Sequence, residues 1–382
     1  AGDDVFGIAG DAGGVGVFGL QAEVNVSFAE AGDRVVLNGQ GGDDVIDATG
    51  LAAGGPALTI NGGLGDDVMF GGAGADLMNG GDGDDVALMG AGDDTFVWNP
   101  GDDNDTIEGQ AGFDTMLFNG AGASENVNIF ANGGRAVFFR DVASVTMDMN
   151  DVEQVVFNAL GGVDNIVVED LSGTDLTEID INLGSAIGGT DGDGAADTVT
   201  AQGTSADDVA LVIGNASGVS VVGLAAQINI TGAESGNDRL IINGFAGDDV
   251  IEASSVSDGA IQLTLDGGAG DDILVGGEGN DTLLGGAGDD VLIGGPGADT
   301  LDGGDGDDVI VSDGFDIVVE SFAAGANSED RIDLSGRGLS FDWLMAHATE
   351  SDGNTVLDLG DHQLTLNGVR SSQLHEHDFI LG

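Results

Sequence analysis

Apolar side chains recur every nine residues in two stretches of the chain, each time two positions after an aspartate. The repeating frame is Gly-Gly-x-Gly-x-Asp-x-U-x, where U is apolar. The first block runs from Gly62 to Val97, with looser copies beginning at Pro100 and Gly109, and the second runs from Gly267 to Val311. This pattern predicts one short strand per frame, which buries one side chain, followed by a glycine-rich turn.

The sixth and eighth positions of the frame are the most regular. The sixth position is always aspartate: Asp67, Asp76, Asp85, Asp94, Asp105, Asp114, Asp272, Asp281, Asp290, Asp299 and Asp308. The eighth is always apolar: Met69, Met78, Ala87, Phe96, Ile107, Met116, Leu274, Leu283, Leu292, Leu301 and Ile310. A disordered Gly/Asp-rich linker does not require an apolar eighth position, so we predict a folded, all-β chain.

A longer repeat contains these frames. Residues 3–30 match residues 207–234 at an offset of 204, and the match continues into the nonapeptides. We therefore predict a β module at 1–61 with one turn of the repeat type, a first block at 62–117, an intervening β module at 118–203, a second-copy β module at 204–266, a second block at 267–311 and a C-terminal region at 312–382. Strands are expected at 127–130, 136–139, 155–157 and 166–168, a hairpin turn at Gly133-Gly134, and a short helix at 341–347.

Charge narrows the function. The chain of 382 residues has 69 Asp and Glu against seven basic residues, all arginine, for a net charge of -62. Binding to nucleic acid or to an anionic membrane needs a basic face and is not expected. No apolar run approaches the length of a membrane span, so none is predicted. Cysteine is absent, so the chain can form neither a disulfide nor a thiolate metal site. Apolar residues make up 41% of the chain, which suffices for a hydrophobic core. The composition favours a fold that requires counter-cations.

The frame has the chemistry of a calcium turn. Ca²⁺ takes six to eight hard oxygen ligands, from carboxylates and main-chain carbonyls, and glycine lets the backbone bend so that carbonyls point inward. Two frames that lie 18 residues apart on one edge of a coil can enclose an ion. The predicted pairs are Asp67 with Asp85, Asp76 with Asp94, Asp272 with Asp290, Asp281 with Asp299, and Asp290 with Asp308. The predicted metal-site residues are Asp44, Gly62, Gly65, Asp67, Gly71, Gly74, Asp76, Gly80, Gly83, Asp85, Asp94, Asp249, Gly267, Gly270, Asp272, Gly276, Gly279, Asp281, Gly285, Gly288, Asp290, Gly294, Gly297, Asp299, Gly303, Gly306 and Asp308.

These tandem frames resemble the repeats-in-toxin, or hemolysin-type, calcium-binding proteins. The resemblance implies a parallel β-roll or β-solenoid with several Ca²⁺ ions along both edges. Met89 and Pro100 replace the first glycine of their frames, and two extra residues, Trp98-Asn99, follow the fourth frame. We expect this slip to break the edge register, so Asp105 and Asp114 are not predicted as ligands.

The C-terminus carries a second resemblance. Asp330-Arg331-Ile332-Asp333-Leu334-Ser335, the alternating 355–359 and 363–369 segments, and the final Asp378-Phe379-Ile380-Leu381-Gly382 are similar to the capping and targeting region of Gram-negative type I secretion substrates. This implies a secreted, extracellular protein that is exported by the type I machinery with an uncleaved signal. Association with the cell surface is a further expectation. An ordinary β cap that closes the roll is the alternative interpretation, and both can hold.

Other chemistry finds little support. His375-Glu376-His377 lacks the spacing of a zinc-protease helix, and both histidines are expected to be solvated. Gly14 to Gly19 matches a dinucleotide-binding fingerprint without a following helix and is interpreted as strand and turn. Asp191-Gly192-Asp193-Gly194 has Ala195 where an EF-hand needs a ligand. Paired carboxylates are too numerous for a glycosidase pair to stand out. We therefore predict no enzymatic activity.

We expect a secreted protein whose folding is triggered by extracellular Ca²⁺, acting as a structural, surface or adhesin-type module with an unidentified surface or matrix partner. The alternative is the secretion and folding tail of an extracellular protease or lipase. Ice binding would need regular Thr or Asn rows, which Leu64, Ala73 and Asp82 do not provide. Because Ala1 aligns with Ser205 inside a β unit, the N-terminus is expected to be a cut end of a longer chain.

Overall fold

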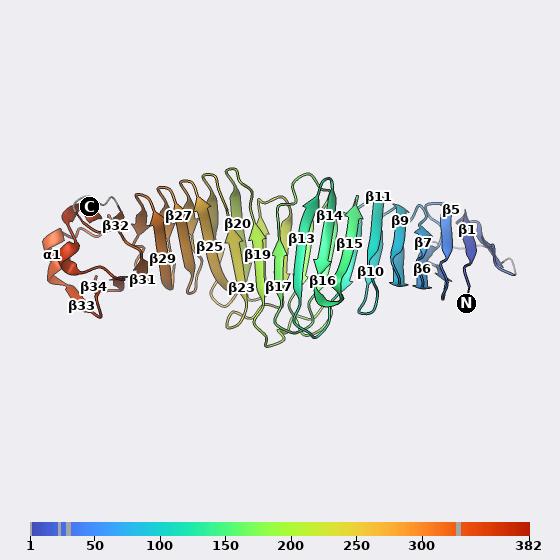
Figure 1. Cartoon of the computed structure of the whole chain (residues 1–382), viewed down its shortest axis with the longest axis horizontal. Helices are drawn as coiled ribbons and strands as arrows, with labels where there is room; N and C mark the ends of the chain where they lie inside the picture. The colour runs from blue at the N-terminus through green and yellow to red at the C-terminus, as the bar shows by residue number, and fades with distance from the viewer. Residues whose placement is uncertain (1, 22–23, 28–31, 326–329) are drawn as a thin grey trace. The chain divides into compact units, whose positions relative to one another are not determined.

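The computed structural model describes residues 2–21, 24–27, 32–325 and 330–382. Two compact units are present, Ala1–Asp193 and Gly194–Gly382. Each is built from two sheets whose strands are mostly parallel, which confirms the predicted all-β roll (Figure 1). Ala1, on which the expectation of a cut N-terminus depends, lies outside the described residues, as do 22–23 and 28–31 of the predicted duplication.

Apart from the strands in residues 5–27 and 126–150, successive strands of unit 1 alternate between two sheets. In order of pairing, its first sheet contains β3 (Val24–Ser27), β2 (Gly14–Phe18), β1 (Val5–Asp11), β5 (Val45–Leu51), β7 (Val68–Phe70), β9 (Asp85–Ala91), β11 (Asp105–Ala111), β15 (Val145–Asn150), β14 (Arg135–Arg140), β13 (Asn126–Asn132) and β17 (Asn165–Val168). Its second sheet contains β4 (Arg34–Asn38), β6 (Ala57–Leu64), β8 (Asp76–Asp82), β10 (Thr95–Trp98), β12 (Thr115–Asn119), β16 (Gln154–Asn158) and β18 (Glu178–Asn182).

Unit 2 has the same construction. Its first sheet contains β19 (Thr198–Gln202), β23 (Arg239–Asn243), β25 (Gln262–Ala269), β27 (Thr282–Ala287), β29 (Ala298–Asp305), β31 (Asp316–Glu320), β35 (Gln363–Leu366), β34 (Asn354–Asp358) and β33 (Ala348–Ser351). Its second sheet contains β22 (Gln227–Thr231), β21 (Gly218–Val222), β20 (Val209–Asn215), β24 (Val250–Val256), β26 (Ile273–Val275), β28 (Val291–Ile293), β30 (Val309–Val311), β32 (Arg331–Leu334) and β36 (Phe379–Leu381).

The nine-residue period explains this alternation. One frame supplies a strand to one sheet and the next frame supplies a strand to the other, so residues 18 apart become parallel neighbours. Leu283 of β27 thus pairs with Leu301 of β29, as Figure 1 shows for the adjacent strands. All eleven predicted eighth-position side chains are buried, with exposed fractions of 0 or 1%. A single inward row from each sheet forms the core between them.

The two extra residues at Trp98-Asn99 do not break the register, so that prediction was wrong. They are absorbed at the end of β10 and in the turn that follows it. There Asp102 Oδ2 accepts a 2.7 Å hydrogen bond from Asn99 N, and Trp98 Nε1 donates to Asp103 O at 2.9 Å. Beyond this turn β11 pairs with β9 in register, with Asp105 opposite Asp85. A loop that closes on itself tolerates insertion because the strands on either side keep their partners.

The duplicated modules share an antiparallel meander beside a parallel coil. In the first copy β1, β2 and β3 form it, and in the second β20, β21 and β22 do, with the same register shift in the parallel pairing of β1 with β5 and of β20 with β24. The intervening module has a meander too, formed by β13, β14 and β15 around the predicted turn at Gly133-Gly134. The four strands predicted in this module are present in β13, β14, β16 and β17.

The C-terminal region contains the predicted helix. α1 spans Phe341–Ala346 and begins at Ser340, whose hydroxyl accepts a hydrogen bond from Trp343 N. Short 3₁₀ turns occur at η1 (Val142–Ser144), η2 (Ser371–Gln373) and η3 (Glu376–Asp378). Strands β33, β34 and β35 form a meander that pairs with β31, and β36 pairs with β32. In the described residues no helix is long and apolar enough to span a bilayer.

The inward and outward residues of one strand make a matched stability test. Leu283 is fully buried, whereas the next residue, Leu284, lies on the outer face and is only partly covered. We expect Leu283→Ala to lower the free energy of unfolding in calcium by about 2–5 kcal/mol, and Leu284→Ala by under ~1.5 kcal/mol. Denaturant unfolding followed by circular dichroism measures both. Equal losses would contradict the assigned inward row.

Candidate calcium-binding turns

Every predicted aspartate ligand is buried at the start of a strand. The exposed fractions of Asp67, Asp85, Asp272 and Asp290 are 0 or 1%, and those of the remaining predicted aspartates do not exceed 4%. The frame produces this position because the strand begins between the fifth and the seventh residue, which leaves the carboxylate facing the turn above the core. A buried ionised carboxylate is costly unless it is paired or coordinates a metal.

One carboxylate oxygen is held by the neighbouring coil. Asp67 N donates to Asp85 Oδ1 at 2.7 Å, and Asp272 N donates to Asp290 Oδ1 at 2.8 Å. The same bond joins Asp76 to Asp94, Asp281 to Asp299, and Asp290 to Asp308. The structure therefore brings together all five pairs that the 18-residue spacing predicted. We call this row of bonds the sixth-position ladder.

The second carboxylate oxygen, Oδ2, has no hydrogen-bond partner in most of these turns. Oδ2 is buried and accepts no hydrogen bond in Asp44, Asp67, Asp85, Asp94, Asp105, Asp114, Asp249, Asp272, Asp290, Asp299 and Asp308. In Asp76 and Asp281, by contrast, Oδ2 accepts from Gly72 N and Gly277 N at 2.6 and 2.8 Å. Buried acceptors without partners are rare in folded proteins, so a whole row of them indicates a missing positive ligand.

The first glycine of the frame leaves room for this oxygen. A Cβ atom built on Gly62 would lie 2.2 Å from Asp67 Oδ2, and one on Gly285 would lie 2.3 Å from Asp290 Oδ2. The glycine at the fourth position is required for a different reason. Gly65 and Gly288 have φ of 113° and 135°, a region that side chains disfavour. Gly74 differs, because no atom lies within 4 Å of its built Cβ and its φ is not in that region.

Sequence reasoning missed a second ladder at the fifth position. Asp84 N donates to Asp66 Oδ1 at 3.0 Å, and Asp289 N donates to Asp271 Oδ1 at 2.9 Å. These bonds run from the later coil to the earlier one, opposite in direction to the sixth-position ladder. These side chains are exposed. Recurrence of the Asp-Asp doublet at positions five and six of the frame was the signal that could have identified this row.

The sixth-position ladder also extends beyond the nonapeptides. Asp4 N donates to Asp44 Oδ1, Asp208 N donates to Asp249 Oδ1, and Asp308 N donates to Asp330 Oδ1. The repeating frame suggested that Asp308 is the last acid on its edge of the roll. In the structure Asp330 follows it. The signal for these residues is an acid two positions before a buried apolar side chain, as in Asp330 and Ile332.

Burial sets the protonation of these groups. Desolvation raises the pKa of Asp290 to about 7; the hydrogen bond from Asp272 N opposes the rise, and the charges of Asp308 and Asp272 add to it. Desolvation likewise raises the pKa of Asp85 and Asp94 to about 7, and that of Asp67 and Asp308 to about 6. At Asp105 it raises the pKa to about 9, with the Asp85 charge as the next contribution. A bound cation would reverse this preference for the neutral acid.

The donor set fits calcium. It consists of carboxylate oxygens and glycine-rich turns, with neither cysteine nor histidine, which is the hard-oxygen set that Ca²⁺ prefers. In the described parts of the chain no three Asp, Glu or His side chains converge as a metal cluster. Two carboxylates per ion would therefore need main-chain carbonyl oxygens to complete the coordination shell.

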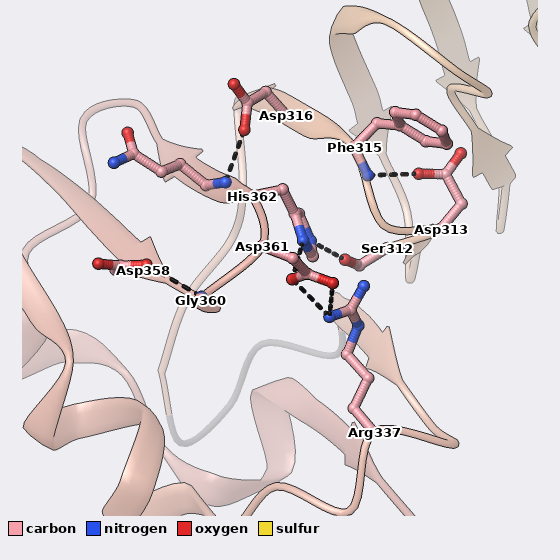
Figure 2. Close-up of polar contacts among 10 residues, drawn as sticks. Ser312, Asp313, Phe315, Asp316, Arg337, Asp358, Gly360, Asp361 and His362 are labelled. Atoms are coloured by element: carbon pink, nitrogen blue, oxygen red, sulfur yellow. Dashed lines mark hydrogen bonds and ion pairs between the residues drawn. The ribbon is translucent and has the colours of Figure 1, made fainter.

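The second array ends at a different kind of contact, drawn in Figure 2. Register places Ile317 of β31 opposite Asp299, so the same offset places Ser312 where Gly294 stands in the preceding coil. Ser312 Oγ lies 2.9 Å from Nε2 of the buried His362, whose Nδ1 lies 2.7 Å from Asp361 Oδ1. Arg337 Nη1 donates to Asp361 Oδ1 at 3.0 Å. Hydrogen-bonded side chains of the C-terminal region thus replace the carboxylate row at this coil.

This Ser-His-Asp series has the order of a hydrolase triad, but it has the environment of a packing contact. Ser312 N, which would face a substrate oxygen in such a site, donates to Asp333 O at 3.1 Å. The Asp361 side chain is 64% exposed and shared with Arg337. We interpret the series as the bond between the last coil and the meander of β33, β34 and β35. His375 and His377 are exposed, as predicted.

Comparison with known proteins agrees with this geometry. The model of the RTX calcium-binding nonapeptide repeat matches residues 59–87, 100–116, 264–283 and 284–316. A solved structure, the crystal structure of extracellular lipase LipA from Serratia marcescens, shows 17% identity over 85% of this chain, with a TM-score of 0.17. This chain covers 40% of that lipase chain, and a TM-score so low supports no argument about fold or activity. No curated protein sequence matches.

Two arrays of buried aspartates on a parallel roll define a calcium-type repeat protein. The chain carries RTX calcium-binding repeats of the hemolysin type, and the match confirms the resemblance drawn from the frames. The match includes the looser copies over residues 100–116, where Asp105 and Asp114 continue the ladder across the slip at 20-residue spacing.

The first-position glycine provides a test of site geometry. We expect Gly62→Ala to raise the calcium concentration for half-folding several-fold, because its methyl group would collide with Asp67 Oδ2. Gly74→Ala is the matched control and should leave the midpoint within about twofold, since its Cβ would meet open space. Calcium titration followed by circular dichroism measures both midpoints. A Gly62→Ala midpoint equal to that of Gly74→Ala would show that Oδ2 is not the functional oxygen.

The raised pKa values predict acid-promoted folding without calcium. A carboxyl whose folded-state pKa is raised contributes stability below its ordinary pKa of 3.8, and that stability is lost as pH rises through about 6 to 7. Calcium-stripped protein should therefore gain β structure as pH falls from 8 to 5, by circular dichroism. Repeating the series in 0.5 M NaCl screens exposed charges and isolates the buried groups. Stripped protein that is no more folded at pH 5 than at pH 8 would refute this.

Proposed function

We propose that this chain is a secreted calcium-binding β-roll protein that folds on meeting extracellular Ca²⁺ and serves as a structural or surface module of the adhesin type. The observation that carries the proposal is the row of buried Oδ2 atoms without hydrogen-bond partners. Except in the frames of Asp94 and Asp105, which begin with Met89 and Pro100, the first residue of the turn is a glycine whose missing side chain leaves room for this oxygen. A cation is the ligand that such a row lacks.

Charge makes the ion a condition of folding. At a net charge of -62 the ion-free chain repels itself, and closing the coils would bring further carboxylates out of water. Each Ca²⁺ offsets two negative charges and contributes its binding free energy directly to folding. Extracellular calcium modules bind with a Kd on the order of 10⁻⁴ to 10⁻³ M, which leaves such a chain unfolded inside a cell and folded outside.

The duplicated architecture supports a structural role over an enzyme tail. The two units repeat the same meander and array, and a stack of coils offers long, uniform faces. RTX repeat proteins are typically secreted. We propose the type I machinery as the export route, with the signal in residues 312–382, where the sequence is similar to that of its substrates.

A calcium titration with paired variants tests the proposal. The protein should show little β signal in chelator and a full β-roll spectrum at millimolar calcium. Asp290→Asn should raise the calcium midpoint several-fold, because Asp290 lies between Asp272 and Asp308 and serves two neighbouring turns. If Asp330 is also a ligand, Asp308→Asn should raise the calcium midpoint as much as Asp290→Asn does. If Asp330 is not a ligand, the rise for Asp308→Asn should be smaller than that for Asp290→Asn.

Asp352→Asn is the control, because it removes the same charge from an exposed turn of the C-terminal meander. Its midpoint should equal that of the unmodified protein. A spectrum that is unchanged between chelator and calcium would overturn the proposal, as would equal midpoints for Asp290→Asn and Asp352→Asn.

A further inference from the structure

One acid of the intervening module is paired with an arginine inside the protein. Glu125 precedes β13, and Arg140 is the last residue of β14. Their side chains are 0% and 4% exposed, and Arg140 Nη2 donates to Glu125 Oε1. Among the arginine–carboxylate ion pairs in the described part of the chain, this pair alone has both side chains buried. In the other pairs each side chain is at least one-fifth exposed.

Glu125 occupies the place that aspartate has in the calcium turns. Its N–H donates to Asp164 Oδ1 at 2.8 Å, the bond of the sixth-position ladder. A Cβ atom on Gly120, five residues earlier, would lie 2.6 Å from Glu125 Oε2, just as one on Gly62 would lie 2.2 Å from Asp67 Oδ2. Val127, two residues later, is the buried eighth-position side chain. The frame 120–128 is thus a nonapeptide in geometry although its sequence has lost most of the pattern.

Arg140 lies outside the frame 120–128, at the end of β14. Antiparallel pairing of β13 with β14 places Arg140 opposite Val127, beside the turn that holds Glu125. Its guanidinium carbon lies 5.3 Å from the centre of the Trp98 ring and 5.9 Å from that of Phe118. A guanidinium stays charged at all relevant pH values and is stabilised by aromatic faces. A fixed positive charge therefore faces the acid at this turn, where the arrays have none.

The same segment has a core of a different kind. Trp98 and Phe118 stack with ring centres 4.0 Å apart and an angle of 4° between their planes. Phe138 follows at 4.4 Å from Phe118, and Phe157 lies 5.6 Å from Phe138. All four rings are almost fully buried. Aromatic side chains bury more area than the Leu, Met, Ile or Ala that most array frames provide, so this stretch has more stabilisation that does not depend on an ion.

We propose that Arg140 is a built-in replacement for calcium at the 120–128 turn, and that this turn and the aromatic core of Trp98, Phe118, Phe138 and Phe157 consequently stay folded when calcium is absent. The contrast with the arrays rests on the proposed function, which states that they need the ion. The segment then provides a permanently folded end on which the coils of the first array can form as calcium binds. Nucleation on an existing coil is favourable because each coil contacts only its neighbours.

The two tryptophans allow a direct test in the full chain. Trp343→Phe leaves the buried Trp98 as the one fluorophore of this type. In chelator, Trp98 emission should stay blue-shifted, and its quenching by acrylamide should change less than about twofold from the value in calcium. In the same samples trypsin, which can cleave only at arginine here, should cut at Arg239 and Arg331 at least ~10-fold faster in chelator than in calcium.

Variants in this background distinguish a cation role from a packing role. Arg140→Met keeps the bulk and removes the charge, so Trp98 protection should become calcium-dependent, lost in chelator and restored by millimolar calcium. Glu125→Gln with Arg140→Met removes both charges and should be chelator-resistant again. Arg135→Met is the matched control, because Arg135 lies on the same strand in partly exposed ion pairs with Glu108 and Asp148. This variant should leave the protection of Trp98 resistant to chelator.

Two results would overturn the proposal. One is Trp98 becoming accessible in chelator in the Trp343→Phe protein, in step with cleavage at Arg239 and Arg331. The other is Arg140→Met remaining as chelator-resistant as Arg135→Met. If Arg140→Met does not fold even in calcium, the double variant decides, and loss of its Trp98 protection in chelator counts against the proposal. Cleavage at Arg239 and Arg331 that ignores calcium would instead contradict the proposed function and leave the Trp98 result standing.

Discussion

A buried carboxylate with one satisfied oxygen and one unsatisfied oxygen is the constraint on which this structure depends. The backbone N–H of the preceding coil satisfies Oδ1, which fixes the spacing of the coils, and Oδ2 is left facing a turn without a hydrogen-bond partner. Repeating this arrangement along an edge accumulates a desolvation cost that no side chain of the arrays offsets. Under the proposed function, a bound cation offsets this cost, and structure and ion binding then form a single equilibrium.

Much of this could be predicted from the sequence, because the frame is local. Nine residues contain the glycines, the acid and the inward side chain, so the period alone gave the buried row that includes Leu283 and Leu301, and the 18-residue pairs such as Asp272 with Asp290. Glycine at the first position also follows from the frame, although its reason, the room needed by Oδ2, needed coordinates.

What could not be predicted is non-local or has lost the frame. The pairing of Glu125 with Arg140 depends on a hairpin that places a residue 15 positions later beside the turn, and Glu in place of Asp hides the frame from a pattern search. The stacked rings of Trp98 and Phe118 come from successive strands of one sheet. The mistaken expectation at Trp98-Asn99 came from treating coil length as fixed, whereas only the strand partners are fixed.

The varied length of the coils has a consequence for how such a molecule can change. The same N–H to carboxylate bond joins residues 18 apart at Asp67, 20 apart at Asp85, 23 apart at Asp44 and 41 apart at Asp208. The extra residues form a turn or a meander, and the strand that follows them still pairs with the strand of the preceding coil. A new loop, such as a binding peptide, can therefore be inserted into a coil without changing the row of carboxylates at its edge. The roll can in this way act as a scaffold to which binding segments are added one at a time.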